Sequence, residues 1–255
     1  MTLKDFFVEN PRAALAFSGG VDSAYLLHAA LEHGAEVKAY FIKSQFQPEF
    51  ELADACRLVK ELAERFGCDE EKLMQVVPLD VLACEMVAAN PADRCYHCKK
   101  EIFRALMEAA EADGFTVIID GTNASDEEGD RPGMRALKEM EVKSPLRLCG
   151  LTKEEIRRLS KDAGLFTWDK PSYACLATRI PAGRCITAED LERVETAEAN
   201  LERLGFRDFR VRLYHGAARI QVKPEQMELA IVKQREILEQ MKPLFAEILL
   251  DMEGR

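Results

Sequence analysis

Predicted strands and helices alternate along the first two-thirds of the chain, and this alternation limits the fold more than any other feature. Short apolar runs predict buried strands, and each is followed by a segment with the apolar spacing of an amphipathic helix. The predicted strands are 12–17, 36–42, 72–77 and 116–120. Because such strands pair in parallel when helices cross between them, we predict an α/β fold whose parallel sheet has helices on both faces.

The pattern changes near residue 167. Residues 166–186 contain two prolines and show no clear periodicity. A helix with Thr187 as its cap follows, then two strands, a helix from about Pro224 and a last strand near 246–251. We therefore predict two domains, 1–167 and 168–255, of which the second is a small α+β domain.

Charge and apolar content limit the partners. The net charge of −10 argues against nucleic acid as the main partner, because phosphate backbones usually bind a basic surface. No apolar run approaches the roughly 20 residues that span a bilayer, and the N-terminal residues do not resemble a signal peptide. We expect a cytoplasmic protein with a small-molecule substrate, in which eight cysteines do not form a disulfide set.

The sequence Ser-Gly-Gly-Val-Asp-Ser, residues 18–23, lies between the first predicted strand and its helix. Glycines let backbone amides approach a phosphate, and the helix N-terminus adds free N–H groups and a positive dipole end. Asp22 would repel a phosphate unless it holds a cation, so Mg²⁺ is expected. Neither a Walker A sequence nor a dinucleotide fingerprint is present. The alternative is a plain glycine-rich turn capped by Ser18, which the full six-residue pattern disfavours.

These six residues resemble the PP-loop of ATP pyrophosphatases, which cleave ATP between its α- and β-phosphates and activate a substrate as its adenylate. The stretches 120–126 (DGTNASD), 131–133 (RPG) and 144–157 (SPL through LTKEEIR) resemble later motifs of that group. The resemblance implies a HUP-like fold and Mg²⁺ held by Asp22 and Asp126. The ATP-binding residues that it implies are Ser18, Gly19, Gly20, Val21, Asp22, Ser23, Ser44, Gly121, Thr122 and Asn123.

The eight cysteines fall into two sets. Four are scattered and are interpreted as packing residues: Cys56, Cys68, Cys84 and Cys149. Cys95 and Cys98 lie one helical turn apart where Asp93 predicts a helix start, with two lysines beside them, a setting that favours the thiolate. This C-x-x-C pair alone is compatible with a redox pair, half a zinc site, part of an iron–sulfur site or simple packing. Cys175 and Cys185 lie in the irregular segment.

Together with the PP-loop, the sequences RCYHCKK (94–100) and DKPSYACLATRIP (169–181) resemble the LarE family of ATP-dependent sacrificial sulfur transferases, over about residues 12–222. The resemblance implies that a carboxylate of pyridinium-3,5-biscarboxylic acid mononucleotide is adenylylated and then attacked by a cysteine. Elimination leaves dehydroalanine on the enzyme and a thiocarboxylate on the product, a precursor of the nickel-pincer nucleotide cofactor. By this resemblance Cys175 bears the sulfur, and the chain forms a homo-oligomer, a hexamer.

Family members with three cysteines resemble iron–sulfur tRNA thiolases, in which three thiolates hold a [4Fe–4S] cluster with one open iron. Cys95, Cys98 and Cys175 match that pattern, and thiolate ligation suits such a cluster. A cluster would spare Cys175 from consumption. Zinc is the competing metal, because Cys185 could complete a tetrahedral site of four thiolates.

The remaining expectations concern the substrate. Arg210 and Arg212 lie on one face of a predicted strand and suit a phosphate or carboxylates, although two solvent-facing arginines would give the same pattern. Lys99 and Arg179 are further predicted substrate contacts. Gln221 stands where the family pattern has an acidic residue, and the sequence ends sooner than in typical members, so details of the substrate or oligomer site are expected to differ.

Two other readings remain open from the sequence. The first is a PP-loop tRNA thiolase or an ATP-dependent amide ligase, for which the chain shows no RNA-binding appendage and no glutaminase domain. The second is a nucleotide-binding module that has lost its chemistry, against which the intact residues 18–23 argue.

Overall fold

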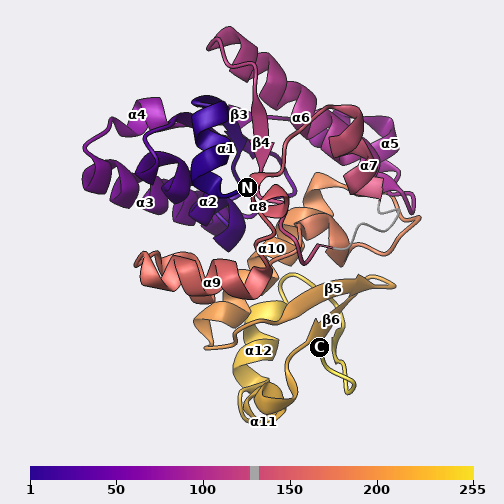
Figure 1. The fold of residues 1–255 in the computed structure, drawn as a ribbon. Coiled ribbons are helices and arrows are strands. Elements are labelled where there is room, and N and C mark those ends of the chain that lie inside the picture. Colours follow the sequence, from indigo (N-terminus) through magenta and orange to yellow (C-terminus); the bar gives the residue numbers. More distant parts are fainter. Residues whose placement is uncertain (127–131) are drawn as a thin grey trace. The chain divides into compact units, whose positions relative to one another are not determined.

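The computed structural model describes residues 1–126 and 132–255, which form two compact units (Figure 1). The first unit comprises Met1–Val81 and Asp93–Ser172, and the second comprises Leu82–Ala92 and Tyr173–Arg255. The boundary between Ser172 and Tyr173 lies in the irregular segment 166–186, near the boundary predicted from the sequence. Nothing in the sequence pattern indicates that residues 82–92 join the later unit.

A four-stranded parallel sheet with strand order β3-β2-β1-β4 forms the centre of the first unit. The predicted α/β fold with a parallel sheet is confirmed. The strands are β1 (Arg12–Ala16), β2 (Glu36–Lys43), β3 (Met74–Pro78) and β4 (Ile118–Asp120).

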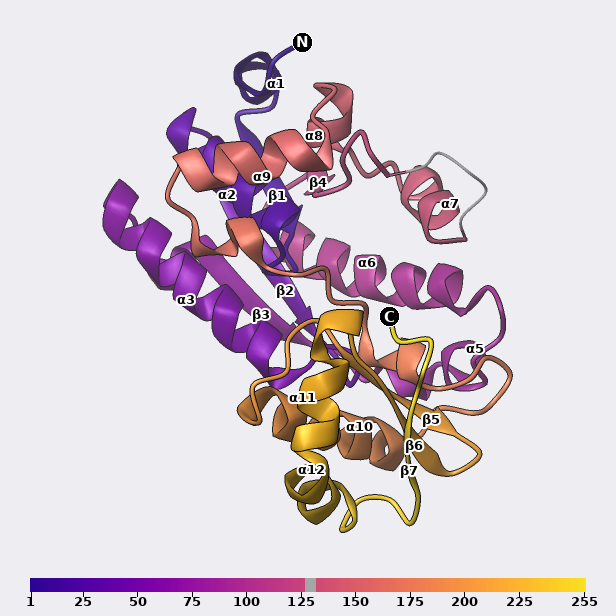
Figure 2. The same ribbon diagram turned by 90° about the horizontal axis from the view of Figure 1, so that it is seen from below.

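Helices cover both faces of this sheet, and the two-residue period of the strands assigns each side chain to a face (Figure 2). Ala13 and Leu15 of β1 pack with α2 (Val21–Glu32), α3 (Glu49–Phe66) and α9 (Lys153–Asp162). Ala14, between them, packs on the other side with α6 (Arg94–Ala112) and α7 (Pro132–Glu139). The shorter helices of this unit are α1 (Leu3–Glu9), α4 (Glu70–Leu73) and α8 (Pro145–Leu148).

The helix ends follow the local signals of the sequence. Thr152 and Glu155 form a reciprocal capping box at the start of α9. Thr187 accepts the N–H of Asp190 at the start of α10 (Ala188–Arg203), and α3 ends at Gly67 in the left-handed conformation. Within the two described ranges, no helix has both the length and the apolar character that a bilayer crossing requires.

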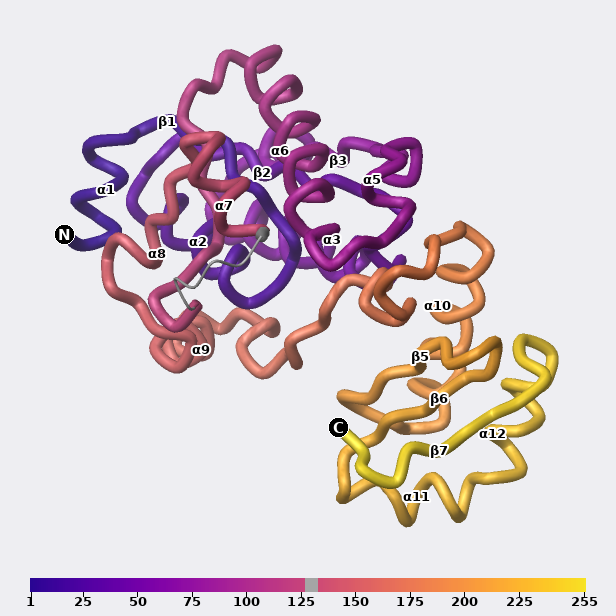
Figure 3. The backbone as a smooth tube through the Cα atoms, turned by 90° about the vertical axis from the view of Figure 1, so that its right-hand side faces the viewer, coloured from indigo at the N-terminus to yellow at the C-terminus, as the bar shows by residue number. Residues whose placement is uncertain are grey.

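The second unit is built on a small sheet with strand order β5-β6-β7 (Figure 3). β5 (Arg210–Tyr214) and β6 (Ala217–Gln221) are antiparallel, and β6 is parallel to β7 (Ile248–Leu250). The helices of the unit are α5 (Glu85–Ala88), α10, α11 (Met227–Val232) and α12 (Gln234–Met241). The helix predicted after Pro224 is thus divided into two, with Lys233 between α11 and α12.

Candidate active site

The turn between β1 and α2 places the predicted phosphate loop at the carboxyl end of the sheet. Gly20 is the N-cap residue of α2, so the first N–H groups of this twelve-residue helix point into the loop. The hydroxyl oxygens of Ser18 and Ser23 lie 3.2 Å apart, and the Gly20 N–H donates to Ser18 Oγ at 3.3 Å. Such a helix start attracts anions through its free N–H groups and its dipole.

The loop that follows β4 lies against the start of α2. β4 pairs with β1 in register, with Ala16 opposite Asp120, so their carboxyl ends are neighbours. A Cβ atom on Gly121 would come within 2.9 Å of the Ser23 backbone nitrogen, which only glycine avoids. Asn123 Nδ2 donates to Asp22 Oδ1 at 3.3 Å. The structure therefore brings residues 18–23 together with Gly121 and Asn123, as an ATP site at this sheet edge requires.

Ser44 follows β2, which neighbours β1 on its other side. Its side chain is buried and its hydroxyl donates to Gln47 Oε1 at 2.7 Å. The Phe46 N–H donates to Ser44 Oγ at 3.3 Å. Ser44 thus shapes its own turn beside the phosphate loop.

Asp22 forms an ion pair that the sequence reading missed. Its carboxylate lies 2.5 Å from the Nζ atom of Lys153, the first residue of α9. The Lys153 N–H also donates to Ser125 Oγ at 2.9 Å, which ties α9 to the loop after β4. A cation therefore lies where the sequence predicts Mg²⁺. The sequence offered one indication that Lys153 belongs to the site, since it lies inside the motif LTKEEIR.

The other acidic residues at this edge are engaged by their own loop. The Asp126 carboxylate accepts the Asn123 N–H at 2.9 Å, and Arg147 donates to the Asp126 carbonyl. Buried Asp120 accepts hydrogen bonds from the hydroxyls of Thr122 at 2.5 Å and Ser144 at 2.7 Å. Among the described residues, no three His, Cys, Asp or Glu side chains are arranged to hold a metal ion. A metal ion at Asp22 would therefore need oxygens of a bound phosphate among its ligands.

Helix α6 carries the C-x-x-C pair and Lys99. Burial lowers the pKa of Lys99, while the nearby charges of Asp120, Cys95, Asp126 and Cys98 act in the opposite direction. Lys99 therefore connects the cysteine pair electrostatically with the loop after β4. Cys95 is exposed, with Sγ lying 3.7 Å from a guanidinium nitrogen of Arg94, and Cys98 is buried.

Two details at the start of α6 differ from the sequence reading. The Asp93 side chain makes no capping hydrogen bond among the described residues, and its carboxylate lies 3.5 Å from His97 Nε2 instead. Lys100 donates to the Tyr96 hydroxyl at 3.3 Å and pairs with Glu139 at 3.5 Å. Lys100 is therefore engaged by Tyr96 and Glu139, whereas Lys99 lies close enough to the cysteine pair to be affected by its charge.

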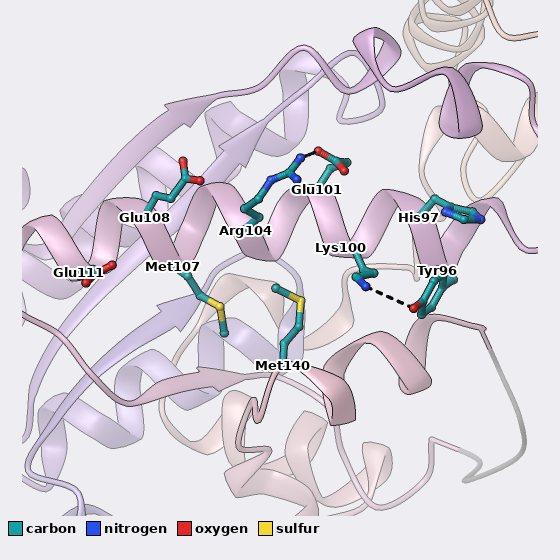
Figure 4. A pocket seen from close by; sticks show the side chains of 9 residues that line it. All are labelled: Tyr96, His97, Lys100, Glu101, Arg104, Met107, Glu108, Glu111 and Met140. Atoms are coloured by element: carbon teal, nitrogen blue, oxygen red, sulfur yellow. Dashed lines mark hydrogen bonds and ion pairs between the residues drawn. The ribbon is translucent and has the colours of Figure 1, made fainter.

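A groove of about 480 Å³ follows α6 from Tyr96 to Glu111 (Figure 4). Lys100 points toward Tyr96 in it, and Met107 and Met140 face each other. None of the predicted site residues belongs to the nine that line it: Tyr96, His97, Lys100, Glu101, Arg104, Met107, Glu108, Glu111 and Met140.

The motif RPG is described only in part, since Arg131 lies outside the described residues and Gly133 belongs to the first turn of α7.

In the second unit, Cys175 starts a tight turn that buried side chains hold. Its carbonyl accepts the N–H of Thr178 at 3.0 Å and the Thr178 hydroxyl at 2.9 Å. Fully buried Arg179 donates to the Ala174 carbonyl at 2.9 Å and, through two nitrogens, to both carboxylate oxygens of Glu198 at 2.7 and 3.0 Å. Arg179 therefore holds the Cys175 turn through these contacts, and its predicted contact with the substrate stays a prediction.

Glu198 on α10 is a site residue that the sequence reading missed. Besides Arg179 it accepts the Tyr173 hydroxyl at 2.5 Å and the Val211 N–H at 2.8 Å. A buried carboxylate is stable only with such partners. Its spacing from Cys175 gives no periodic signal, so the sequence could not have identified it.

Arg210 and Arg212 of β5 share a face of the small sheet, as predicted from the strand period. Arg212 donates to the Thr178 carbonyl and, at 2.7 Å, to Gln221 Oε1. Arg210 lies 5.0 Å above the Tyr173 ring. Burial lowers the pKa of both guanidinium groups, and the charge of Arg179 lowers it further. Arg210 is buried and Arg212 half-buried, so Arg212 is the more accessible of the two arginines that the sequence predicts as substrate contacts.

The cysteines of the predicted cluster are divided between the units. Cys95 and Cys98 belong to the first unit, and Cys175 and exposed Cys185 belong to the second. A cluster on Cys95, Cys98 and Cys175 would need both units, and it stays a prediction.

Comparison with known proteins gives consistent matches. A family profile described as "Thiamine biosynthesis protein (ThiI)" matches residues 10–202. An uncharacterized protein of Synechocystis sp. is 37% identical, and the alignment covers 99% of this chain and 92% of that one. The pyridinium-3,5-bisthiocarboxylic acid mononucleotide synthase of Lactiplantibacillus plantarum is 30% identical, with 95% and 86% covered.

More distant matches cover less or are weaker. The tRNA-specific 2-thiouridylase MnmA of Thermotoga petrophila is 26% identical over 60% of this chain and 52% of its own length. A solved structure of NMN synthetase from Francisella tularensis aligns with a TM-score of 0.47 at 15% identity, covering 94% of this chain and 89% of that one.

Proposed function

The chain belongs to the PP-loop family of the thiamine biosynthesis protein (ThiI) profile and to its LarE branch of ATP-using, sulfur-transferring enzymes, and from this premise we propose that it makes a thiocarboxylate on pyridinium-3,5-biscarboxylic acid mononucleotide. The observation that carries the proposal is the match to the L. plantarum synthase over 95% of the chain, because it includes both units. The product would enter synthesis of the nickel-pincer nucleotide cofactor.

The first half of the reaction uses the phosphate loop. A substrate carboxylate oxygen attacks the α-phosphorus of ATP, the bond to the bridging oxygen breaks and pyrophosphate leaves. The N–H groups at the start of α2 and the hydroxyls of Ser18 and Ser23 would hold the phosphates. Asp22 would hold Mg²⁺, whose charge stabilises the phosphates during transfer. Lys153, now paired with Asp22, would exchange that carboxylate for a phosphate oxygen.

The second half transfers sulfur to the activated acyl carbon, and AMP leaves. If Cys175 supplies the sulfur, its thiolate forms a thioester. Loss of the Cys175 Cα proton and cleavage of its Cβ–S bond then leave dehydroalanine and release the thiocarboxylate. The hydrogen bonds from Thr178 and Arg179 hold the Cys175 turn for this attack. If Cys95, Cys98 and Cys175 instead hold a [4Fe–4S] cluster, the cluster supplies sulfide and Cys175 stays intact.

The mononucleotide needs groups that bind its phosphate and its two carboxylates. Arg212 keeps its charge in a half-buried position next to the Cys175 turn, and Arg210 adds a second guanidinium group in the same unit. Lys99, in the first unit, stays a predicted substrate contact. Arginine suits such oxyanions because its planar fork can donate two parallel hydrogen bonds.

A direct assay tests the proposal. The protein would be incubated with ATP, Mg²⁺ and the mononucleotide, and AMP, pyrophosphate and the thiocarboxylate measured, the last by mass spectrometry. We expect all three, with pyrophosphate depending on the mononucleotide. Pyrophosphate released only on addition of tRNA would assign the chain to the thiolases instead. Absence of AMP and pyrophosphate with either substrate would leave a binding module.

A further inference from the structure

Asn90 joins two segments of the second unit that are far apart in the sequence. Its side chain is 2% exposed, and Nδ2 donates to the Pro181 carbonyl at 2.9 Å and to the Ile180 carbonyl at 3.5 Å. Its own carbonyl accepts the Gly183 N–H at 2.8 Å. Beside it, the Ala88 carbonyl accepts the Ile186 N–H at 2.7 Å. Residues 88–90 are therefore fixed to residues 180–186 through side-chain and backbone hydrogen bonds.

The residue type suits this place for two separate reasons. Asn90 has φ +54°, a left-handed conformation that asparagine adopts more easily than most side chains. Its amide group also supplies a donor to the carbonyls of Ile180, which is buried, and Pro181, which is exposed, and a buried carbonyl left without a donor is costly. The backbone conformation and the donor are distinct properties, so substitutions can separate them.

The joined segments are those that lead to the reactive cysteines. Asn90 precedes Cys95 by five residues, and Pro181 follows Cys175 by six. We propose that Asn90 is a positioning residue for sulfur transfer, which fixes the segment that leaves the Cys175 turn to the segment that leads to the C-x-x-C pair. The inference rests on the proposed function and adds to it a residue outside the ATP site and the substrate arginines.

A purely structural role and a positioning role predict different results for two substitutions of Asn90. Asn90→Gly and Asn90→Ala both remove the donor, but only glycine tolerates the positive φ without strain. If Asn90 serves stability alone, both variants lower the melting temperature, alanine more than glycine, and the folded glycine variant transfers sulfur like the wild type. If Asn90 positions the cysteine segments, both variants lose sulfur transfer while the glycine variant stays folded.

The experiment measures thiocarboxylate formed per pyrophosphate released, in the full chain with ATP, Mg²⁺ and the mononucleotide. For Asn90→Gly we expect pyrophosphate release like that of the wild type and a ratio lowered about 10- to 100-fold, the size of effect that a small misplacement of reacting groups produces. Asn200→Ala is the matched control, because buried Asn200 also donates to a carbonyl in this unit, that of Gln240 at 3.3 Å. Its ratio should stay unchanged.

Hydrogen exchange of the amides at 183 and 186 supplies a readout that does not depend on the reaction. We expect faster exchange in Asn90→Gly than in the wild type or in Asn200→Ala. Faster exchange with an unchanged ratio of thiocarboxylate to pyrophosphate would show that Asn90 only stabilises the structure, and it would overturn the positioning role. Unchanged exchange together with an unchanged ratio would overturn it as well. If the wild type itself releases no pyrophosphate, the proposed function fails, and the role of Asn90 fails with it.

Discussion

At the scale of single residues, we predict that Asp22 holds the metal ion of the phosphate loop. Replacing Asp22 by asparagine keeps its shape and removes the charge, so we expect pyrophosphate release to fall by about 10²-fold or more, the loss typical when a transition-state charge contact is removed. ATP binding should also lose its dependence on Mg²⁺, measured by calorimetry. Asp5→Asn is the control, since Asp5 caps α1. Mg²⁺-dependent ATP binding that persists in Asp22→Asn would remove Asp22 as the metal ligand.

Replacing Arg212 tests whether this residue binds the mononucleotide. For Arg212→Ala we expect weaker binding of the mononucleotide by about 1.5–3 kcal/mol, the worth of a hydrogen bond to a charged group, and unchanged affinity for ATP, because the ATP motifs lie in the other unit. Titration calorimetry with each ligand separates the two. The control is Arg203→Ala, which removes an arginine on α10 that donates to Asn200. Equal mononucleotide affinity in all three proteins would contradict the assignment.

At the scale of elements, α2 carries a buried histidine that makes its packing depend on pH. His28 is 7% exposed, its Nδ1 atom has no hydrogen-bond partner among the described residues, and its ring packs 5.6 Å from that of Phe66. Burial lowers the pKa of His28 below its value in the unfolded chain. The unfolded chain therefore binds the proton more readily, and the stability present above about pH 6.5 falls as the pH drops toward the folded-state pKa.

We expect the melting temperature to fall between pH 7 and pH 5, and to fall less in His28→Phe, because phenylalanine keeps the ring and cannot be protonated. His33→Gln serves as the control, since His33 is the exposed C-cap residue of the same helix. Identical pH dependence in the wild type and His28→Phe would show that other groups govern the acid response.

Elements that form through local signals were predictable from the sequence, and contacts across long separations were not. The strands of the parallel sheet and the caps at Thr152 and Thr187 follow from apolar spacing and from residues three positions apart. The Lys153–Asp22 ion pair joins residues 131 positions apart, and the Asn90–Pro181 bond joins residues 91 apart. The motif LTKEEIR contains Lys153 but does not show its pairing with Asp22, and no period or motif indicates Glu198 or the transfer of residues 82–92 to the later unit, so these required the structure.

At the scale of the whole molecule, the residues proposed for the two halves of the reaction belong to different units. The phosphate loop and the C-x-x-C pair are in the first, and Cys175 with its arginines is in the second. A purely sacrificial enzyme needs only Cys175. A cluster enzyme needs cysteines from both units, and this chain provides them.

The sulfur source is therefore a property of the whole chain, and we predict a [4Fe–4S] cluster on Cys95, Cys98 and Cys175. Such ligation leaves one iron open and makes Cys185 dispensable, whereas a closed zinc site would need four thiolates. Protein reconstituted anaerobically and supplied with sulfide should complete several turnovers with the mass of its Cys175 peptide unchanged. Cys95→Ala should abolish repeated turnover, and Cys185→Ala should retain it. Loss of one sulfur from Cys175 for each thiocarboxylate formed would show instead that the cysteine is consumed, and the cluster would then have no role as the sulfur source.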